Sequence, residues 1–143
     1  MHELNYDDLH IGDEMPKLVK GPIPKLQHVM YAGASGDFNP MHTDDEFARA
    51  VGMKYGVITH GMLVMGFVGQ AITSWVPLKC LRRYGVRFSG MTKPGNTITI
   101  TGKVVDKRVE SGQNIITCEV TAVDEKGDVK ISGSFDAALP TKG

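Results

Sequence analysis

Apolar and polar positions follow two different periods along this chain, a helical period before Pro77 and a period of two after it. The most apolar stretch is 61–76, which reads Gly-Met-Leu-Val-Met-Gly-Phe-Val-Gly-Gln-Ala-Ile-Thr-Ser-Trp-Val. Because this stretch is apolar on nearly every face, it predicts a helix that is buried all round. It is too short and too rich in glycine to cross a bilayer. We expect Gly66 and Gly69 to let another backbone approach the helix closely.

Two shorter helices are predicted before this stretch. Pro24 fits the first turn of one helix and Gly36 lies just beyond its end, with apolar positions at Leu26, Val29, Met30 and Ala34. A loop rich in turn-forming residues follows. The segment 43–46, Thr-Asp-Asp-Glu, has the pattern of a capping box, which makes Thr43 the cap of a second helix. That helix is expected to end at Gly52.

The remainder of the chain predicts strands. Apolar residues alternate with polar or small ones in 84–88 and 98–105, and the strands 115–123 and 129–138 are separated by turn signals. We expect consecutive antiparallel strands connected by short hairpins. One buried helix followed by such strands predicts an α+β fold, with a curved antiparallel sheet wrapped around a long central helix.

Length and charge exclude several classes of protein. The 143 residues fit one domain, residues 1–143, with room for a real core. Sixteen basic and sixteen acidic residues give a formal net charge of zero and are scattered, so no nucleic-acid surface is expected. Residues 1–8 carry neither a basic nor an apolar segment, so no signal peptide and no membrane association is expected. Cys80 and Cys118 lack metal-ligand spacing and are expected to be buried thiols in a cytoplasmic protein.

Candidate chemistry centres first on Asp37 and His42, which lie on opposite sides of Asn39-Pro40. Such a loop can fold back and present a carboxylate and an imidazole to one small molecule. This pair suits proton transfer, because an imidazole titrates near neutral pH and a carboxylate can accept a proton from water. The alternative is that Asp37 only bonds to the backbone of its own turn.

A second candidate is the start of the apolar helix, Thr59-His60-Gly61-Met62. Gly61 has no side chain, so its N–H can face a ligand, and the helix N-terminus adds a positive partial charge. These are the features that hold a carbonyl oxygen on its way to an enolate. The alternative is that Thr59 and His60 merely cap the helix.

Metal and nucleophile chemistry are weaker interpretations of the same residues. His42, His60 and either Asp44 or Asp45 are the ligand types of a two-histidine, one-carboxylate site. Acidic residues in the first turn of a helix have a simpler explanation in the helix dipole, so no metal and no other cofactor is expected. No sequence context marks an activated nucleophile. The methionines Met62 and Met65 are expected in the core or in an acyl pocket.

Three ordered motifs carry a family resemblance. The stretch 31–49, Tyr-Ala-Gly-Ala-Ser-Gly-Asp-Phe-Asn-Pro-Met-His-Thr-Asp-Asp-Glu-Phe-Ala-Arg, closely resembles the hydratase-2 signature of MaoC-like (R)-specific enoyl-CoA hydratases. Residues 58–63, Ile-Thr-His-Gly-Met-Leu, resemble the segment that leads into the central helix of that family. Tyr-Gly-Val-Arg-Phe at 84–88 and Lys-Pro-Gly-Asn at 93–96 are similar to the strand and turn that follow.

The resemblance implies a single hotdog unit that dimerises, as a homodimer or with a second hotdog subunit. It implies reversible syn addition of water to a trans-2-enoyl thioester, giving a (3R)-3-hydroxyacyl thioester. Asp37 and His42 would hold the water, with Asp37 favoured as the proton acceptor and the reverse division left open. The Gly61 N–H would bind the thioester oxygen. Asn39 would support the loop, and His60, Met62 and Met65 would support or bind the substrate. Some relatives have a serine at the position of Gly69; the glycine here would leave space for the acyl chain.

Other interpretations remain open at this point. A hotdog thioesterase usually needs a carboxylate on the central helix, and 61–76 contains none. A non-catalytic acyl-thioester sensor or partner subunit would need an output module or would lack the catalytic pair. The acyl length, the pathway and the carrier, coenzyme A or acyl carrier protein, are not determined. Four basic residues could meet phosphates or an acidic carrier, or simply be solvated: Lys79, Arg82, Arg83 and Arg87.

Overall fold

The computed structural model describes residues 3–143, so Met1 and His2 of the segment considered for a signal peptide lie outside the described residues. The helices and strands, in chain order, are β1 (Leu18–Lys20), α1 (Lys25–Ser35), α2 (Asp45–Ala50), α3 (Gly61–Thr73), β2 (Leu81–Phe88), β3 (Ile98–Glu110), β4 (Gln113–Val123) and β5 (Val129–Ala138). Short 3-10 turns lie at Tyr6–Asp8, Pro40–His42 and Leu78–Cys80.

The five strands form one antiparallel sheet in the order β1-β3-β4-β5-β2. The predicted hairpins between β3 and β4 and between β4 and β5 are confirmed. The prediction that all strands follow one another through hairpins is wrong for β2, which pairs with β5 at the far edge and not with β3. β1 was not predicted, because its three residues are too few to establish an alternating pattern; it pairs with the start of β3.

Local features of β3 and β4 follow from their sequence. Ser111 and Gly112 both have positive φ angles, 50° and 75°, and close a two-residue hairpin between β3 and β4. The register shifts between Val104 and Asp106, which leaves Val105 as an extra residue in β3. Such a bulge bends a strand, as a sheet that curves around a helix requires.

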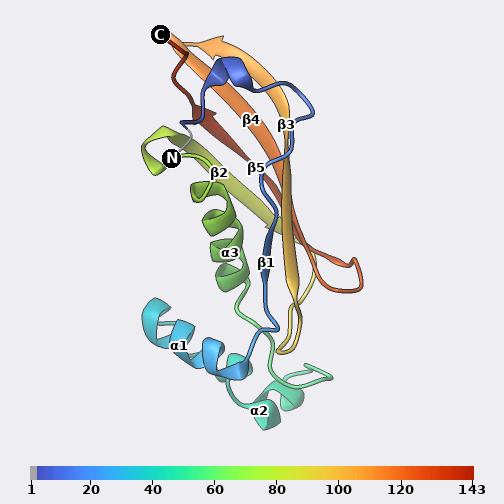
Figure 1. The fold of residues 1–143 in the computed structure, drawn as a ribbon. Coiled ribbons are helices and arrows are strands. Elements are labelled where there is room, and N and C mark those ends of the chain that lie inside the picture. The colour runs from blue at the N-terminus through green and yellow to red at the C-terminus, as the bar shows by residue number, and fades with distance from the viewer. Residues whose placement is uncertain (1–2) are drawn as a thin grey trace.

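Helix α3 lies along the concave face of the sheet (Figure 1) and contacts β3 and β4. This arrangement confirms the α+β fold with a curved antiparallel sheet around a central helix. The face of α3 that packs on the sheet carries its buried side chains, which are Leu63, Val64, Phe67, Val68, Ala71 and Ile72. They join the apolar side chains of β3, β4 and β5 in one hydrophobic core.

Two predictions about the helices are wrong. Helix α3 is not buried all round in the single chain: Met62 and Gly66 are exposed, and no atom lies within 4 Å of the position that a Gly66 side chain would take. Thr43 is not the cap of α2. Asp44 is, because its carboxylate accepts hydrogen bonds from the N–H groups of Glu46 and Phe47 at 3.0 and 3.2 Å.

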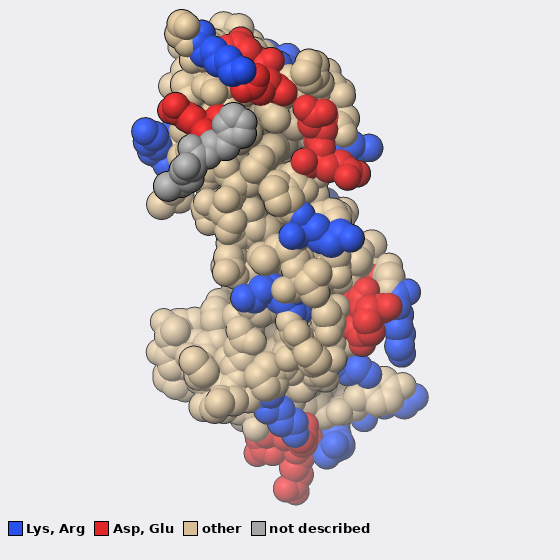
Figure 2. Space-filling model, viewed as in Figure 1, with Lys and Arg blue, Asp and Glu red and all other residues tan. Residues whose placement is uncertain are grey.

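The apolar residues of α1 face outward. Leu26, Val29 and Met30 are 66%, 56% and 65% exposed, whereas the buried residues of this helix are His28 and Ala32. In Figure 2 the lobe at the lower left, where Figure 1 shows α1, is an almost uncharged surface. Within residues 3–143, no helix is both long and apolar enough to cross a membrane.

Candidate active site

A left-handed glycine and a side-chain hydrogen bond to the backbone shape the loop after α1. Gly36 adopts a left-handed conformation with φ 77° and its N–H bonds to Ala32, which ends the helix and turns the chain. The Asn39 side chain then accepts a hydrogen bond of 3.0 Å from the Met41 N–H and starts the short turn that ends at His42. Asn39 therefore organises the loop, as the sequence predicts.

This loop brings Asp37 and His42 together. The Nε2 atom of His42 lies 3.6 Å from Oδ2 of Asp37. The other carboxylate oxygen, Oδ1, accepts a hydrogen bond of 3.2 Å from the Asn39 N–H. The His42 side chain is largely buried, whereas that of Asp37 is 51% exposed. One oxygen of Asp37 therefore supports its own turn and the other faces the imidazole, and the role of Asp37 in proton transfer stays a prediction.

The hydrogen bonds of His42 determine its tautomer. Its Nδ1 lies 2.8 Å from the carbonyl oxygen of Ile58, which can only accept, so Nδ1 carries the hydrogen. In the neutral ring Nε2 is then an acceptor, like the carboxylate of Asp37. A separation of 3.6 Å is too long for a direct hydrogen bond between these two atoms. One water molecule can instead donate one hydrogen to each of them.

His60 supports the His42 ring. The two imidazoles are stacked, with centroids 3.8 Å apart and planes inclined by 22°. The Nε2–H of His60 donates to the Asp37 carbonyl at 3.1 Å, while its buried Nδ1 has no partner among the described residues. Burial lowers the pKa of His60, and the nearby His42 lowers it further. His60 is thus a neutral ring that packs against His42, and its hydrogen bond connects the Asp37 loop to the start of α3.

His28 is a site residue that the sequence analysis missed. It is fully buried under the loop. Its Nδ1 donates to the carbonyl oxygen of His42 at 2.8 Å, and its Nε2 lies 2.8 Å from the Thr59 hydroxyl. His28 therefore joins the loop of Asp37 and His42 to the segment that precedes Gly61. The one available signal was its place on the α1 face shared with Tyr31 and Ala32, three and four residues later.

We expect the free energy of unfolding to fall as the pH is lowered below about 6.5. Burial lowers the pKa values of His28 and His60 from that ordinary value. The unfolded chain therefore takes up protons before the folded chain does, and acid favours unfolding; above 6.5 this contribution to stability is complete. Urea unfolding at pH 7.5 and 5.5 measures this decrease in the free energy of unfolding. The decrease should be smaller in His28→Leu and unchanged in His10→Leu, a change at an exposed histidine. An unchanged dependence in His28→Leu would contradict this account.

Gly61 is the first residue of α3, and its N–H has no hydrogen-bond acceptor among residues 3–143. It lines a cavity of about 180 Å³ together with Ile58 from the segment before α3, Phe88 at the end of β2 and Met91 from the loop after β2. A side chain at Gly61 would begin 3.2 Å from the Phe88 ring. Glycine therefore keeps the cavity open, and the N–H is available to an oxygen atom bound there.

The residues proposed for acyl binding lie further along α3. Met62, Met65 and Gly69 are not among the described residues that line the cavity at Gly61. The Met65 carbonyl accepts a hydrogen bond of 2.8 Å from the Tyr84 hydroxyl, and the Tyr84 ring lies 3.8 Å from the position of a Gly69 side chain. Burial raises the pKa of Tyr84 to about 12, so this hydroxyl keeps its hydrogen. The acyl-binding assignment stays a prediction.

The ring geometry disfavours a metal ion at this site. Asp37, His42 and His60 have ligand atoms within 4.8 Å of one another. A metal ion binds in the plane of an imidazole, however, and two rings stacked 3.8 Å apart cannot both direct a nitrogen at one ion. The two carboxylates that the sequence offered as metal ligands make other contacts: Asp44 caps α2, and Asp45 pairs with Lys25.

Comparison with known proteins agrees with this fold and with this arrangement of motifs. The family model described as MaoC like domain matches residues 10–126. The chain is 36% identical over 83 residues to the enoyl-CoA hydratase ChsH3 of Mycobacterium tuberculosis, covering 55% of this chain and 28% of that protein. It is 28% identical over 120 residues to the (R)-specific enoyl-CoA hydratase of Rhodospirillum rubrum, covering 80% of this chain and 78% of that protein.

The fold itself is similar to a solved hydratase structure. The unliganded R-hydratase PhaJ1 from Pseudomonas aeruginosa superposes with a TM-score of 0.84 at 22% identity, covering 98% of this chain and 88% of that one. The expected hotdog fold is therefore confirmed. The chain spans only 28% of the length of the mycobacterial relative, and 10% and 4% of relatives from Neurospora crassa and Aspergillus oryzae.

Proposed function

Because this chain belongs to the MaoC-like domain family, we propose that it is a hydro-lyase that adds water reversibly to trans-2-enoyl thioesters. The product would be a (3R)-3-hydroxyacyl thioester. We take residues 1–143 as one hotdog unit that carries the catalytic pair Asp37 and His42. The observation that carries the proposal is the pair of facing acceptors, Oδ2 of Asp37 and Nε2 of His42, 3.6 Å apart.

In this mechanism Asp37 and His42 hold the attacking water by its two hydrogens. Asp37 accepts a proton as the water oxygen attacks C3 of the enoyl thioester, while Nε2 of His42 orients the water through the hydrogen that stays on the new hydroxyl group. Asp37 then passes the proton to the facing Nε2 of His42, which delivers it to C2, so that one water is added and both residues return to their starting state. The loop supports this arrangement because His28, Asn39 and the Ile58 carbonyl hold its backbone and the His42 ring by hydrogen bonds. A positioned acid or base typically accelerates such a step 10²–10⁴-fold.

Gly61 is proposed to bind the thioester oxygen. Negative charge develops on this oxygen as water attacks C3, and the free N–H at the start of α3 lies at the positive end of the helix dipole. This supports an enolate-like intermediate in the same way as an oxyanion hole supports a tetrahedral one. Both the water site and the oxyanion site are then built from segments joined by His28 and His60.

The first experiment is to mix purified protein with crotonyl-CoA and follow the ultraviolet absorbance of the conjugated enoyl group. We expect the absorbance to fall towards an equilibrium, and chiral analysis of the product should give the 3R isomer. Release of free thiol without hydration would support a hotdog thioesterase instead. Binding without any turnover of crotonyl-CoA or a longer enoyl-CoA would support the alternative of a non-catalytic acyl-thioester-binding subunit.

We further propose that the unit works as a dimer, by default a homodimer. The exposed apolar stripe of α1, formed by Leu26, Val29 and Met30, lies at the same end of the molecule as the Asp37 loop (Figure 1). Phe38, next to Asp37, is exposed too. A second copy on this face would bury the stripe and cover the open side of Asp37. It would also enclose the exposed face of α3, where Met62 and Gly69 are assigned to acyl binding.

Val29→Glu is expected to convert the dimer into monomers. A carboxylate buried without a partner in the interface would cost about 3 kcal/mol, which weakens the dissociation constant of the dimer roughly 100-fold. Sedimentation velocity at several concentrations measures the change. The control is Val109→Glu, because Val109 is 70% exposed but belongs to β3 and not to the stripe. A wild-type monomer, or equal effects of both variants, would contradict the proposed interface.

A further inference from the structure

His28 is a polar side chain buried by a helix that otherwise exposes its apolar ones. Its ring is fully buried, whereas apolar residues of the same helix, such as Leu26 and Met30, are exposed. A buried imidazole costs free energy unless its nitrogen atoms are paired, and a leucine would fill a similar volume without that cost. What a histidine supplies at this place is therefore its two hydrogen bonds, to the His42 carbonyl and to the Thr59 hydroxyl.

The direction of both hydrogen bonds is determined by the groups involved. A carbonyl oxygen can only accept, so Nδ1 of His28 carries the hydrogen that it donates to His42 at 2.8 Å. In the neutral ring Nε2 is an acceptor, and the Thr59 hydroxyl donates to it at 2.8 Å. Burial lowers the pKa of His28, and this outweighs the bond to the carbonyl, which acts in the opposite direction. The nearby His60, His42 and Lys25 lower the pKa further, so the neutral ring holds both partners at once.

These two bonds complete a closed ring of hydrogen bonds around His42. Among residues 3–143, the carbonyl oxygen of His42 accepts from the His28 side chain and from no backbone N–H. At the other end of the same residue, the imidazole Nδ1–H donates to the Ile58 carbonyl. Ile58 and Thr59 are consecutive, and one residue separates them from Gly61. The backbone and the ring of His42 are thus both tied to the dipeptide that leads into Gly61, and His28 makes the connection to the backbone.

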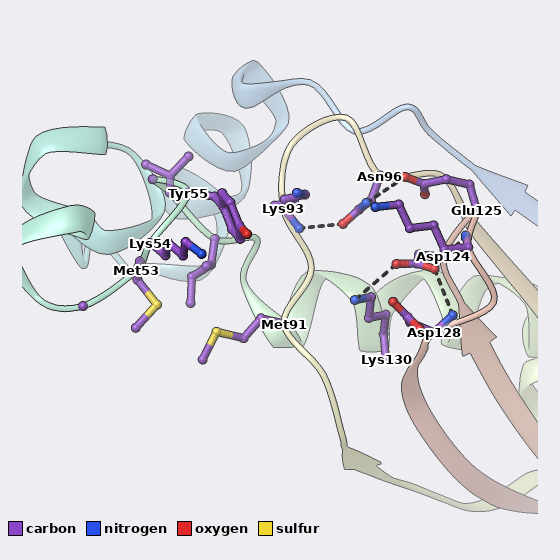
Figure 3. A pocket seen from close by; sticks show the side chains of 15 residues that line it. Met53, Lys54, Tyr55, Met91, Lys93, Asn96, Asp124, Glu125, Asp128 and Lys130 are labelled. Carbon is purple, nitrogen blue, oxygen red and sulfur yellow. Dashed lines mark hydrogen bonds and ion pairs between the residues drawn. The ribbon is translucent and has the colours of Figure 1, made fainter.

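The loop before β3 holds this ring of hydrogen bonds in place. The Thr59 N–H donates to the Thr92 carbonyl of this loop at 2.7 Å. Ile23, just before α1, donates to the Asn96 carbonyl of the same loop at 3.0 Å. Figure 3 shows the Asn96 side chain bonded to Glu125, in the turn between β4 and β5. Thr59 and helix α1 are thus both anchored to the sheet.

We propose that His28 is a positioning residue that fixes the separation between the water site and the oxyanion site. This role rests on the hydratase function proposed above. The attacking water lies at Asp37 and His42 and the thioester oxygen at the Gly61 N–H, so the two sites must match the distance from C3 of the substrate to its carbonyl oxygen. His28 is buried and does not touch the substrate. It acts through the His42 backbone and through Thr59, and a displacement of about 1 Å between reacting groups can cost about 100-fold in rate.

The test is a double-mutant cycle of Thr59→Val and His28→Leu, with crotonyl-CoA hydration measured well below the melting temperature of every variant. Each single variant is expected to lower kcat about 10- to 100-fold and to leave KM within about twofold, because the groups that bind the thioester stay in place. The double variant should be no slower than the slower single one, since a connection that is already cut cannot be cut again. The control Thr121→Val removes a hydroxyl that bonds to Thr101 on the sheet and should change neither kcat nor KM.

A nitrogen-15 NMR spectrum of the histidine rings separates this role from the hydratase function, because it needs no turnover. His42, assigned from the signals missing in His42→Asn, should be a single Nδ1–H tautomer in the wild type and a mixture of tautomers in His28→Leu and in Thr59→Val. That change supports the role of His28 even if no thioester is hydrated. Wild-type kcat in the single variants, losses that multiply in the double variant, or an unchanged His42 tautomer in both single variants would overturn it even if the wild type is a hydratase.

Discussion

Asp37→Asn is expected to lower kcat for crotonyl-CoA hydration about 1,000-fold, in the middle of the range for loss of a general base. Asparagine keeps an oxygen that can accept the hydrogen bond from the Asn39 N–H, so the loop should keep its shape. It does not accept a proton from water. Because Asp37 is half exposed and lies outside the core, the melting temperature should change little. Steady-state kinetics and a thermal melt of the same preparation measure both quantities.

A neighbouring carboxylate provides the matched control. Asp44 lies in the same segment and caps α2 through its side-chain oxygen. Asparagine is as good a helix cap as aspartate, so Asp44→Asn should keep the structure and leave kcat within about twofold. If Asp37→Asn retained more than a tenth of the wild-type kcat, or if the two variants lost activity alike, the role assigned to Asp37 would be wrong.

Removal of the Gly61 N–H should have a comparable effect. The variant Gly61→Pro/Phe88→Ala is expected to lower kcat about 100- to 1,000-fold, the usual loss when one oxyanion donor is removed. Proline is tolerated at the first position of a helix. His60, which precedes it, has ψ 126°, a backbone angle that suits a residue before proline. The Phe88 change is included because a side chain at Gly61 would press on that ring.

The control for this variant is Gly61→Ala/Phe88→Ala, which adds a side chain at the same place and relieves the same contact but keeps the N–H. Its kcat should lie within about tenfold of the wild type, and the difference between the two double variants reports the N–H alone. Crotonyl-CoA kinetics with both proteins measure it. Equal kcat values would show that this N–H does not stabilise the transition state.

The sequence was sufficient where local patterns determine the structure. The alternation in 98–138 predicted β3, β4 and β5, because each strand buries one face and hairpin turns separate them. The proximity of Asp37 and His42 was also predictable, since turn residues and a short 3-10 turn bring the two ends of this segment together. The family resemblance then gave these residues a chemical meaning that their composition alone did not.

Other features depend on contacts that no local pattern records. The place of β2 beside β5 is set by the whole sheet and not by its own eight residues. His28 looked like an unremarkable polar position, and its two hydrogen bonds join residues 14 and 31 positions away. The apolar pattern of α1 predicted a helix correctly, but a pattern cannot tell whether the covering surface belongs to the same chain or to another.

The outward-facing residues of α1 have a consequence for how the protein behaves on dilution. If a second copy is what covers Leu26, Val29 and Met30, the folded, active form is favoured by mass action and its population depends on protein concentration. Specific activity would then fall, and melting would shift to lower temperature, as the sample is diluted through the dissociation constant of the pair. Turnover numbers from nanomolar assays and from concentrated preparations would differ for this reason alone.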